Sequence, residues 1–102
     1  MIPVLLADDH SFMRAGVEAV LRGTRYQLVA AVSDGDAALR YVRGHKPDVL
    51  VLDLNMPGGS SLEAIPQILE ASPGTSIAVL TMQDEPAFAR QALGAGALAY
   101  VL

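Results

Sequence analysis

Short apolar segments alternate with longer amphipathic segments along the whole of this 102-residue chain. The clearest apolar segments are residues 2–7, 48–53 and 76–80, and turn-forming residues or helix-like spacing follow each of them. Short apolar runs bounded by turn residues are typical of buried strands. Strands that alternate with helices predict a doubly wound α/β fold, in which a parallel sheet carries helices on both faces.

The boundaries of these elements follow from capping and breaking residues. Five strands are expected, over residues 2–7, 27–32, 48–53, 76–80 and 97–102. Four helices are expected, the first capped by Ser11 and ended by Gly23, and the others over residues 36–43, about 61–71 and 84–93.

Three details of the helices can be tested against a structure. The buried stripe of the first helix is expected to consist of Ala15, Val17, Ala19, Val20 and Leu21. Gly44 is expected to close the second helix. Pro66 predicts a kink or a late start in the third helix, because proline removes a backbone hydrogen bond from a helix interior.

The apolar run before Asp53 predicts a central strand that is buried on both faces.

Composition excludes several classes of function. The chain has no cysteine, which excludes disulfides, thiolate metal sites and cysteine nucleophiles. Its net charge of −4 argues against nucleic-acid binding by this piece alone. No apolar run approaches the roughly 20 residues of a membrane span, and the first residues lack the basic region of a signal peptide. The length predicts one domain, and the expected location is cytoplasmic.

Polar side chains follow three of the expected strands where these strands end. Asp8 and Asp9 follow the first strand, Asp53 ends the third, and Thr81 follows the fourth. Ligands of doubly wound sheets bind at the carboxyl ends of the strands, so these side chains are expected to gather at one edge. An aspartate after a strand often serves only as a helix cap. Three carboxylates with a hydroxyl favour a site for a hard cation, and Mg²⁺ is the usual choice beside phosphate.

Several ordered motifs resemble those of bacterial response-regulator receiver domains of two-component systems. Asp8-Asp9-His10, followed by Arg14 and Gly16, is most similar to the NarL/FixJ-type branch, whose output domains are of the LuxR type. The match spans the chain in order, over residues 5–10, 14–17, 51–58, 78–81, 94–97 and 99–102. The resemblance implies a flavodoxin-like sheet with strand order 2-1-3-4-5.

The resemblance also implies roles for single residues. Asp53 matches the phosphoacceptor. Asp9 matches a direct Mg²⁺ ligand, Asp8 completes the acidic pocket, and Asn55 matches the position whose backbone carbonyl binds the metal. Thr81 matches the switch hydroxyl, Tyr100 the switch aromatic, and Met82 a residue that controls access to the site. His10 is expected to be a helix-entry residue, since the phosphodonor histidine of this family belongs to the partner kinase.

The function implied is a phosphorylation-dependent switch rather than an enzyme. A sensor histidine kinase would supply the phosphoryl group, and a DNA-binding output domain beyond this chain would read the change. The alternative is a degenerate receiver that acts as a phosphorylation-independent interaction module. A haloacid-dehalogenase-type enzyme fits poorly, because it needs a second aspartate two residues after the nucleophile, where this chain has Asn55.

The chain departs from the family pattern at its C-terminal end. Receivers carry a lysine after the fifth strand and then a fifth helix, whereas these 102 residues stop at Leu102. Lys46 is the only lysine, and it precedes the third strand at the opposite edge, so it cannot substitute. Residues 1–102 are therefore expected to be a truncated receiver domain that is poorly phosphorylated alone. Its uncovered apolar face predicts dimerisation, with a homodimer as the expected form, or else element swapping or aggregation.

Overall fold

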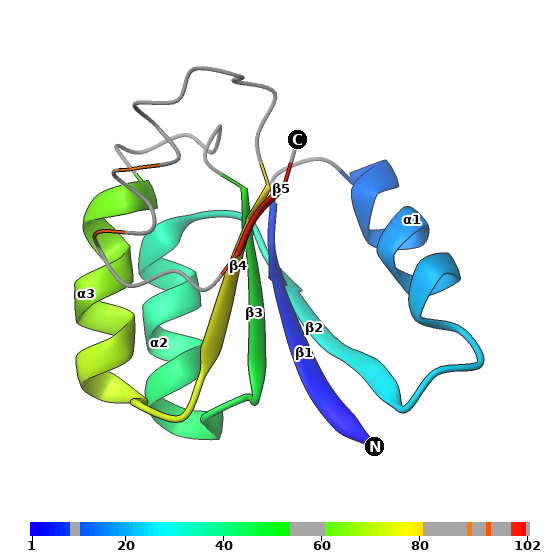
Figure 1. Cartoon of the computed structure of the whole chain (residues 1–102), viewed down its shortest axis with the longest axis horizontal. Coiled ribbons are helices and arrows are strands. Elements are labelled where there is room, and N and C mark those ends of the chain that lie inside the picture. Colours follow the sequence, from blue (N-terminus) through cyan, green and yellow to red (C-terminus); the bar gives the residue numbers. More distant parts are fainter. Residues whose placement is uncertain (9–10, 54–60, 81–89, 91–93, 95–98, 102) are drawn as a thin grey trace.

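Five parallel strands form one sheet at the centre of the molecule (Figure 1). The computed structural model describes residues 1–8, 11–53, 61–80, 90, 94 and 99–101. The sheet order is β2-β1-β3-β4-β5, as expected for a flavodoxin-like fold. The strands are β1 (Ile2–Ala7), β2 (Tyr26–Val32), β3 (Val49–Asp53), β4 (Ser76–Leu80) and β5 (Ala99–Val101).

Among the described residues, three complete helices cover the sheet, and they lie on both of its sides. Helices α2 (Gly35–His45) and α3 (Ser61–Ala71) lie on one side, and α1 (Ser11–Leu21) lies on the other (Figure 1). This arrangement confirms the doubly wound α/β prediction. Of the helix expected over residues 84–93, only Arg90 is described, and it is helical, as is Gly94. No helix in the described ranges is long and apolar enough to cross a membrane.

Helix α2 has a defined cap at each end. The Asp34 carboxylate accepts a hydrogen bond of 2.7 Å from the Ala37 N–H. At the other end Lys46 adopts a left-handed conformation with φ of 46°, and its N–H donates to the Val42 carbonyl at 2.9 Å. The prediction that Gly44 closes this helix was wrong. A single glycine costs a helix only about 1 kcal/mol, which the packing of buried Val42 and the Lys46 cap offset.

Helix α3 begins at Ser61 and contains Pro66 in its interior. Of the two alternatives predicted for this helix, a kink or a late start, the late start was therefore wrong. Ile65 and Ile68, on either side of the proline, are fully buried. Their burial stabilises the helix by roughly 1.5–3 kcal/mol each, which is enough to offset the backbone hydrogen bond that the proline removes.

The main core lies between the sheet and the pair α2 and α3. Leu50 and Leu52 of β3 and Val79 of β4 are fully buried on this side. The alternate residues of β3, Val49 and Val51, face the other side and are only partly buried. The expectation that this strand is buried on both faces therefore holds on one face only.

Helix α1 packs against β2 through a narrow face. Met13, Val17 and Leu21, which follow each other at four-residue spacing, are partly buried. The predicted stripe was wrong for Ala15, Ala19 and Val20, because all three are exposed and Val20 is exposed to 76%. Positions four residues apart share a helix face, whereas the stripe named in the prediction was too wide for one contact with an edge strand.

Candidate functional site

Asp8 and Asp53 lie side by side at the carboxyl edge of the sheet. In the parallel pairing of β1 with β3, Ala7 stands opposite Leu52, so the next residue of each strand is one of these aspartates. The Asp8 N–H donates to the Val32 carbonyl of β2 at 2.9 Å, which fixes the backbone just beyond β1. The sheet register alone therefore brings these two predicted site residues together.

Both aspartates are buried despite their charge. Asp53 is exposed to 6% and Asp8 to 8%. Burying a carboxylate costs free energy unless hydrogen bonds, a cation or a metal compensate for its lost hydration. Two carboxylates at neighbouring strand ends also repel each other, and a cation bound beside them would offset that repulsion.

Asp34 provides a comparison on the same edge. It also follows a strand, β2, but its side chain caps α2. Asp34 therefore acts as a helix cap. Asp8 and Asp53 differ from it because both lie at the ends of adjacent central strands and both are buried.

The other predicted site residues are placed only in part. Asp53 pairs with Leu80 in the β3–β4 register. Thr81 is the residue directly after Leu80 in the chain. Tyr100 pairs with Val79 in the β4–β5 register, one position before the level of Asp53. Thr81 itself lies outside the described residues, as do the predicted site residues Asp9, Asn55 and Met82. His10, which is predicted to be a helix-entry residue, also lies outside them.

The metal site cannot be assembled from the described side chains alone. Within the described ranges, no three His, Cys, Asp or Glu residues form a group that could hold a metal ion. Asp8 and Asp53 supply two carboxylates, and the third predicted carboxylate is Asp9. An all-oxygen donor set of this kind fits Mg²⁺ or Ca²⁺ rather than a metal that prefers imidazole or thiolate.

Lys46 lies at the far end of β3 from Asp53. It caps the C-terminus of α2, three residues before β3 begins, whereas Asp53 ends that strand. The structure therefore confirms that Lys46 is at the opposite edge of the sheet. His45, beside it, stacks on Tyr41 with ring centroids 4.1 Å apart.

Comparison with known proteins agrees with this geometry. Residues 4–102 match the family described as the response regulator receiver domain. The chain belongs to this family. Receiver domains of this kind are signalling modules of two-component systems, and the resemblance noted in the sequence is confirmed.

Relatives place this receiver domain in the NarL/LuxR-type group. The chain is 41% identical over 101 residues to the oxygen regulatory protein NreC of Staphylococcus haemolyticus, covering 97% of this chain and 46% of the relative. It is 35% identical over 102 residues to the response regulator GacA of Pseudomonas aeruginosa, covering 99% and 48%. The chain thus spans about half the length of the curated relatives it matches.

Solved structures show the same fold. The receiver domain of the putative response regulator NarL from Mycobacterium tuberculosis superposes with a TM-score of 0.87 at 34% identity, covering 99% of this chain and 82% of that one. The isolated receiver domain of RcsB from Salmonella enterica gives a TM-score of 0.89 at 30% identity, covering 99% and 76%. Both similarities support the sheet order and the position of the carboxyl edge.

Proposed function

We propose that this domain is a phosphorylation-dependent switch that accepts a phosphoryl group on Asp53. The observation that carries the proposal is the burial of Asp53 beside Asp8 at the carboxyl ends of two central strands. In a doubly wound sheet this edge is where ligands bind. The family membership of residues 4–102 makes phosphoryl acceptance the chemistry to test first.

The proposed reaction is a direct transfer between two proteins. One Asp53 oxygen attacks the phosphorus atom of a phosphohistidine, an O–P bond forms, and the N–P bond to the histidine ring breaks. The electron pair of the broken bond returns to the ring nitrogen. The product is an aspartyl phosphate that carries about two negative charges, so its oxygens need donors and cations around them.

The carboxylate cluster would hold the metal that this chemistry needs. Asp8, Asp9 and Asp53 would supply carboxylate oxygens, and Asn55 would supply its backbone carbonyl. When bound, Mg²⁺ offsets the charge of the carboxylates and of the incoming phosphoryl oxygens. A relative from Burkholderia pseudomallei, 26% identical, was solved with a phosphorylated aspartic acid and a calcium ion.

The switch would begin at the neighbouring strands. Thr81 directly follows Leu80, the register partner of Asp53, so its hydroxyl is proposed to donate to the phosphoryl group. Tyr100, on β5, is proposed to change position in response, and Met82 to limit access to the site. Movement of these residues would alter the surface that a partner recognises.

The partners proposed are those of a two-component pathway in the cytoplasm. A sensor histidine kinase would donate the phosphoryl group, and a DNA-binding output domain outside these 102 residues would respond. A homodimer is the proposed assembly. A solved structure from Staphylococcus aureus is named as a DNA-binding response regulator of the LuxR family. At 22% identity, that structure supports only the fold of this chain.

A phosphodonor experiment tests this function. The chain is incubated with acetyl phosphate and Mg²⁺, and its intact mass is measured. In a chain extended beyond Leu102, an increase by one phosphoryl group is expected for the wild type and for Asp48→Asn, which changes an exposed aspartate just before the start of the same strand. Asp53→Asn should show no increase. If the wild type also shows none in a chain extended beyond Leu102, the phosphorylation-independent interaction module is the better account.

A further inference from the structure

Strand β2 forms an outer edge of the sheet and carries no charged residue. It pairs with β1 on one side and is the terminal strand in the order β2-β1-β3-β4-β5. Its residues, Tyr26–Val32, have the sequence YQLVAAV. Natural proteins commonly protect a long edge strand with charged side chains, proline or a bulge, because its outward N–H and C=O groups can pair with another chain. Of these three protections, β2 has only the bulge.

Exposed apolar side chains gather along this edge. Among the described residues, the large apolar side chains that are exposed are Met1, Val20, Tyr26 and Val29. Tyr26 and Val29 lie on β2 and are exposed to 40% and 42%. Met1 directly precedes Ile2, the register partner of Tyr26, and Val20 lies on the helix that packs against β2. Exposed apolar side chains that lie together mark an interaction surface.

Helix α1 covers β1 more fully than it covers β2. Val4 and Leu6 of β1 alternate with two residues of the main core, Leu5 and Ala7, so they face the side of α1. Their exposures are only 2% and 1%. Leu28 of β2, which lines a pocket beside α1, is only partly buried. The outer flank of β2 is therefore less covered than the strand beside it.

The bulge at Val29 changes which backbone groups of β2 face outward. The Ile2 N–H donates to the Arg25 carbonyl at 2.7 Å, and the Asp8 N–H donates to the Val32 carbonyl at 2.9 Å. These two carbonyls both face β1 although they are an odd number of residues apart. A regular strand turns every second carbonyl toward the same neighbour. The extra residue therefore reverses the alternation in the second half of β2.

The outward backbone groups stand at Tyr26 and Leu28 before the bulge, and at Ala31 and Ser33 after it. The direction at Tyr26 agrees with this, because its N–H donates to the exposed Thr24 hydroxyl at 3.1 Å. Two such strands laid antiparallel match each other in one register. Leu28 of one copy then stands opposite Ala31 of the other, and outward-facing residues that meet in this way exchange their N–H···O bonds.

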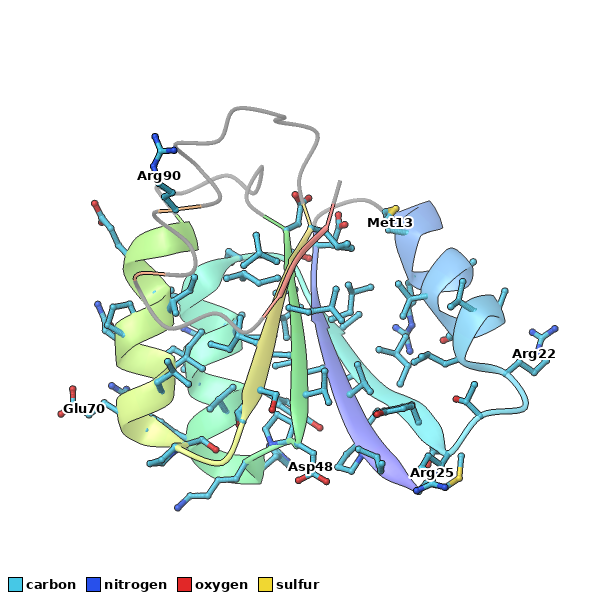
Figure 2. All side chains as sticks on the ribbon, in the orientation of Figure 1. Met13, Arg22, Arg25, Asp48, Glu70 and Arg90 are labelled. Carbon is cyan, nitrogen blue, oxygen red and sulfur yellow. The ribbon has the colours of Figure 1, made fainter. Side chains whose placement is uncertain are left out.

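The same register places opposite charges together at both ends of the pair. Arg25 precedes β2, as Figure 2 shows, and Asp34 follows it in extended backbone with φ of −154° and ψ of 170°. Arg25 of one copy would stand opposite Asp34 of the other. One oxygen of Asp34 caps α2, and a carboxylate has a second oxygen that can accept from a guanidinium. Parallel pairing would instead bring like charges together, which is destabilising.

We propose that β2 is a dimerisation edge, on which a second copy of this chain docks by antiparallel β2–β2 pairing. The two-fold axis passes between Val29 and Ala30, and the sheets of the two copies continue as one. Each copy uses the same surface, so the assembly closes at two copies. The pairing gives the homodimer proposed above a contact surface. It does not depend on phosphorylation of Asp53, which lies on another strand.

A charge placed beside the two-fold axis tests the proposal. Val29→Lys brings two lysines close together in the dimer, and Val20→Lys adds the same charge at an exposed valine of α1. Sedimentation equilibrium without a phosphodonor gives the dimer dissociation constant, and circular dichroism checks that each variant is folded. Val29→Lys should weaken the dimer about tenfold, because like charges on facing strands repel. Val20→Lys and Asp53→Asn should retain the wild-type constant.

Cysteine cross-linking tests the register directly. The chain has no cysteine, so Tyr26→Cys and Ser33→Cys each introduce a single thiol at an exposed position. In the proposed register these positions stand opposite each other with Cα atoms about 5.5 Å apart, a spacing that a disulfide can bridge. Mild oxidation should cross-link a mixture of the two variants. Neither variant alone should cross-link, because identical positions lie at opposite ends of the pair.

Three results would overturn the proposal. The wild type is monomeric throughout the concentration range measured, or folded Val29→Lys dimerises as tightly as Val20→Lys, or the mixture of cysteine variants cross-links no more than each variant alone. If Val29→Lys does not fold, the cross-linking result decides. Loss of phosphorylation in Asp53→Asn with an unchanged dimer would show that the two proposals stand separately.

Discussion

Three aspartates at the ends of strands show how position decides the role of one residue type. Asp34 is a cap, because its carboxylate bonds to the backbone of the helix that follows. Asp8 and Asp53 lie on adjacent central strands and are buried together. The sequence could predict which aspartates follow strands, and the parallel order of the strands was enough to bring these two together.

Replacing Asp34 with alanine should lower the free energy of unfolding by about 1 kcal/mol, because the Ala37 N–H loses its acceptor. Asp34→Asn keeps a side-chain oxygen at the same place and should cost clearly less. Urea unfolding followed by circular dichroism measures both. Equal losses in the two variants would show that the carboxylate does not act as a cap.

Lys46 illustrates a residue-scale feature that the sequence did not reveal. Glycine is the usual residue where a helix ends in a left-handed conformation, and Gly44 is two residues away. The helix nevertheless continues to His45, and Lys46 takes φ of 46°. Packing of Val42 against the core decides this boundary, and such packing depends on contacts from distant parts of the chain.

At the scale of elements, buried hydroxyls join the turn before β4 to the turn before β3. Thr75, before β4, donates from Oγ1 to the Pro47 carbonyl at 2.6 Å. Its oxygen also lies 2.7 Å from Ser72 Oγ, which therefore acts as the donor between the two hydroxyls. The Ser76 N–H donates to the Asp48 carbonyl at 2.8 Å, so the starts of β3 and β4 are aligned by both contacts.

Thr75→Val should lower the free energy of unfolding by about 1–3 kcal/mol, because it leaves the buried Pro47 carbonyl and Ser72 hydroxyl without this partner. Thr24→Val is a matched control. The Thr24 hydroxyl also bonds to a carbonyl, that of Leu21, but it is exposed to water, which can replace the lost bond. Denaturant unfolding of both variants checks the difference, and a larger loss for Thr24→Val would contradict this explanation.

The positions of the strands along the sequence were largely predictable, whereas which side chains of each element are buried was not. Alternation of apolar runs and helical spacing predicted every strand to within two residues at each end. The pairing of β1 with β2 shifts register between Val4 and Leu5, which leaves Val29 as an extra residue in β2. Neither this bulge nor the exposure of Val20 on α1 follows from periodicity, because both depend on how the edge strand and α1 pack.

At the scale of the whole molecule, the two faces of the sheet are covered unequally. Helices α2 and α3 pack together over one face, while α1 contacts β2 on the other (Figure 1). Val79 is fully buried on the first face, and Val51 is partly buried on the second. Core stability should therefore come mainly from the side of α2 and α3.

The same substitution on the two faces measures this inequality. Val79→Ala should lower the free energy of unfolding by about 2 kcal/mol, from the transfer of two methylene equivalents and the cavity left behind. Val51→Ala, on the neighbouring strand, should cost about half as much, since its side chain is already partly hydrated. Unfolding in urea measures both free energies, and equal losses would show that the two faces are equally well covered.

The central claim concerns the identity of the phosphorylated residue. The chain is treated with acetyl phosphate and Mg²⁺, reduced with borohydride, which converts an aspartyl phosphate to homoserine, and then digested and sequenced by tandem mass spectrometry. Homoserine is expected at position 53 in the wild type, and it should be absent when Mg²⁺ is chelated. Homoserine at Asp8 or Asp9, or the same yield at position 53 without the metal, would contradict the proposed site.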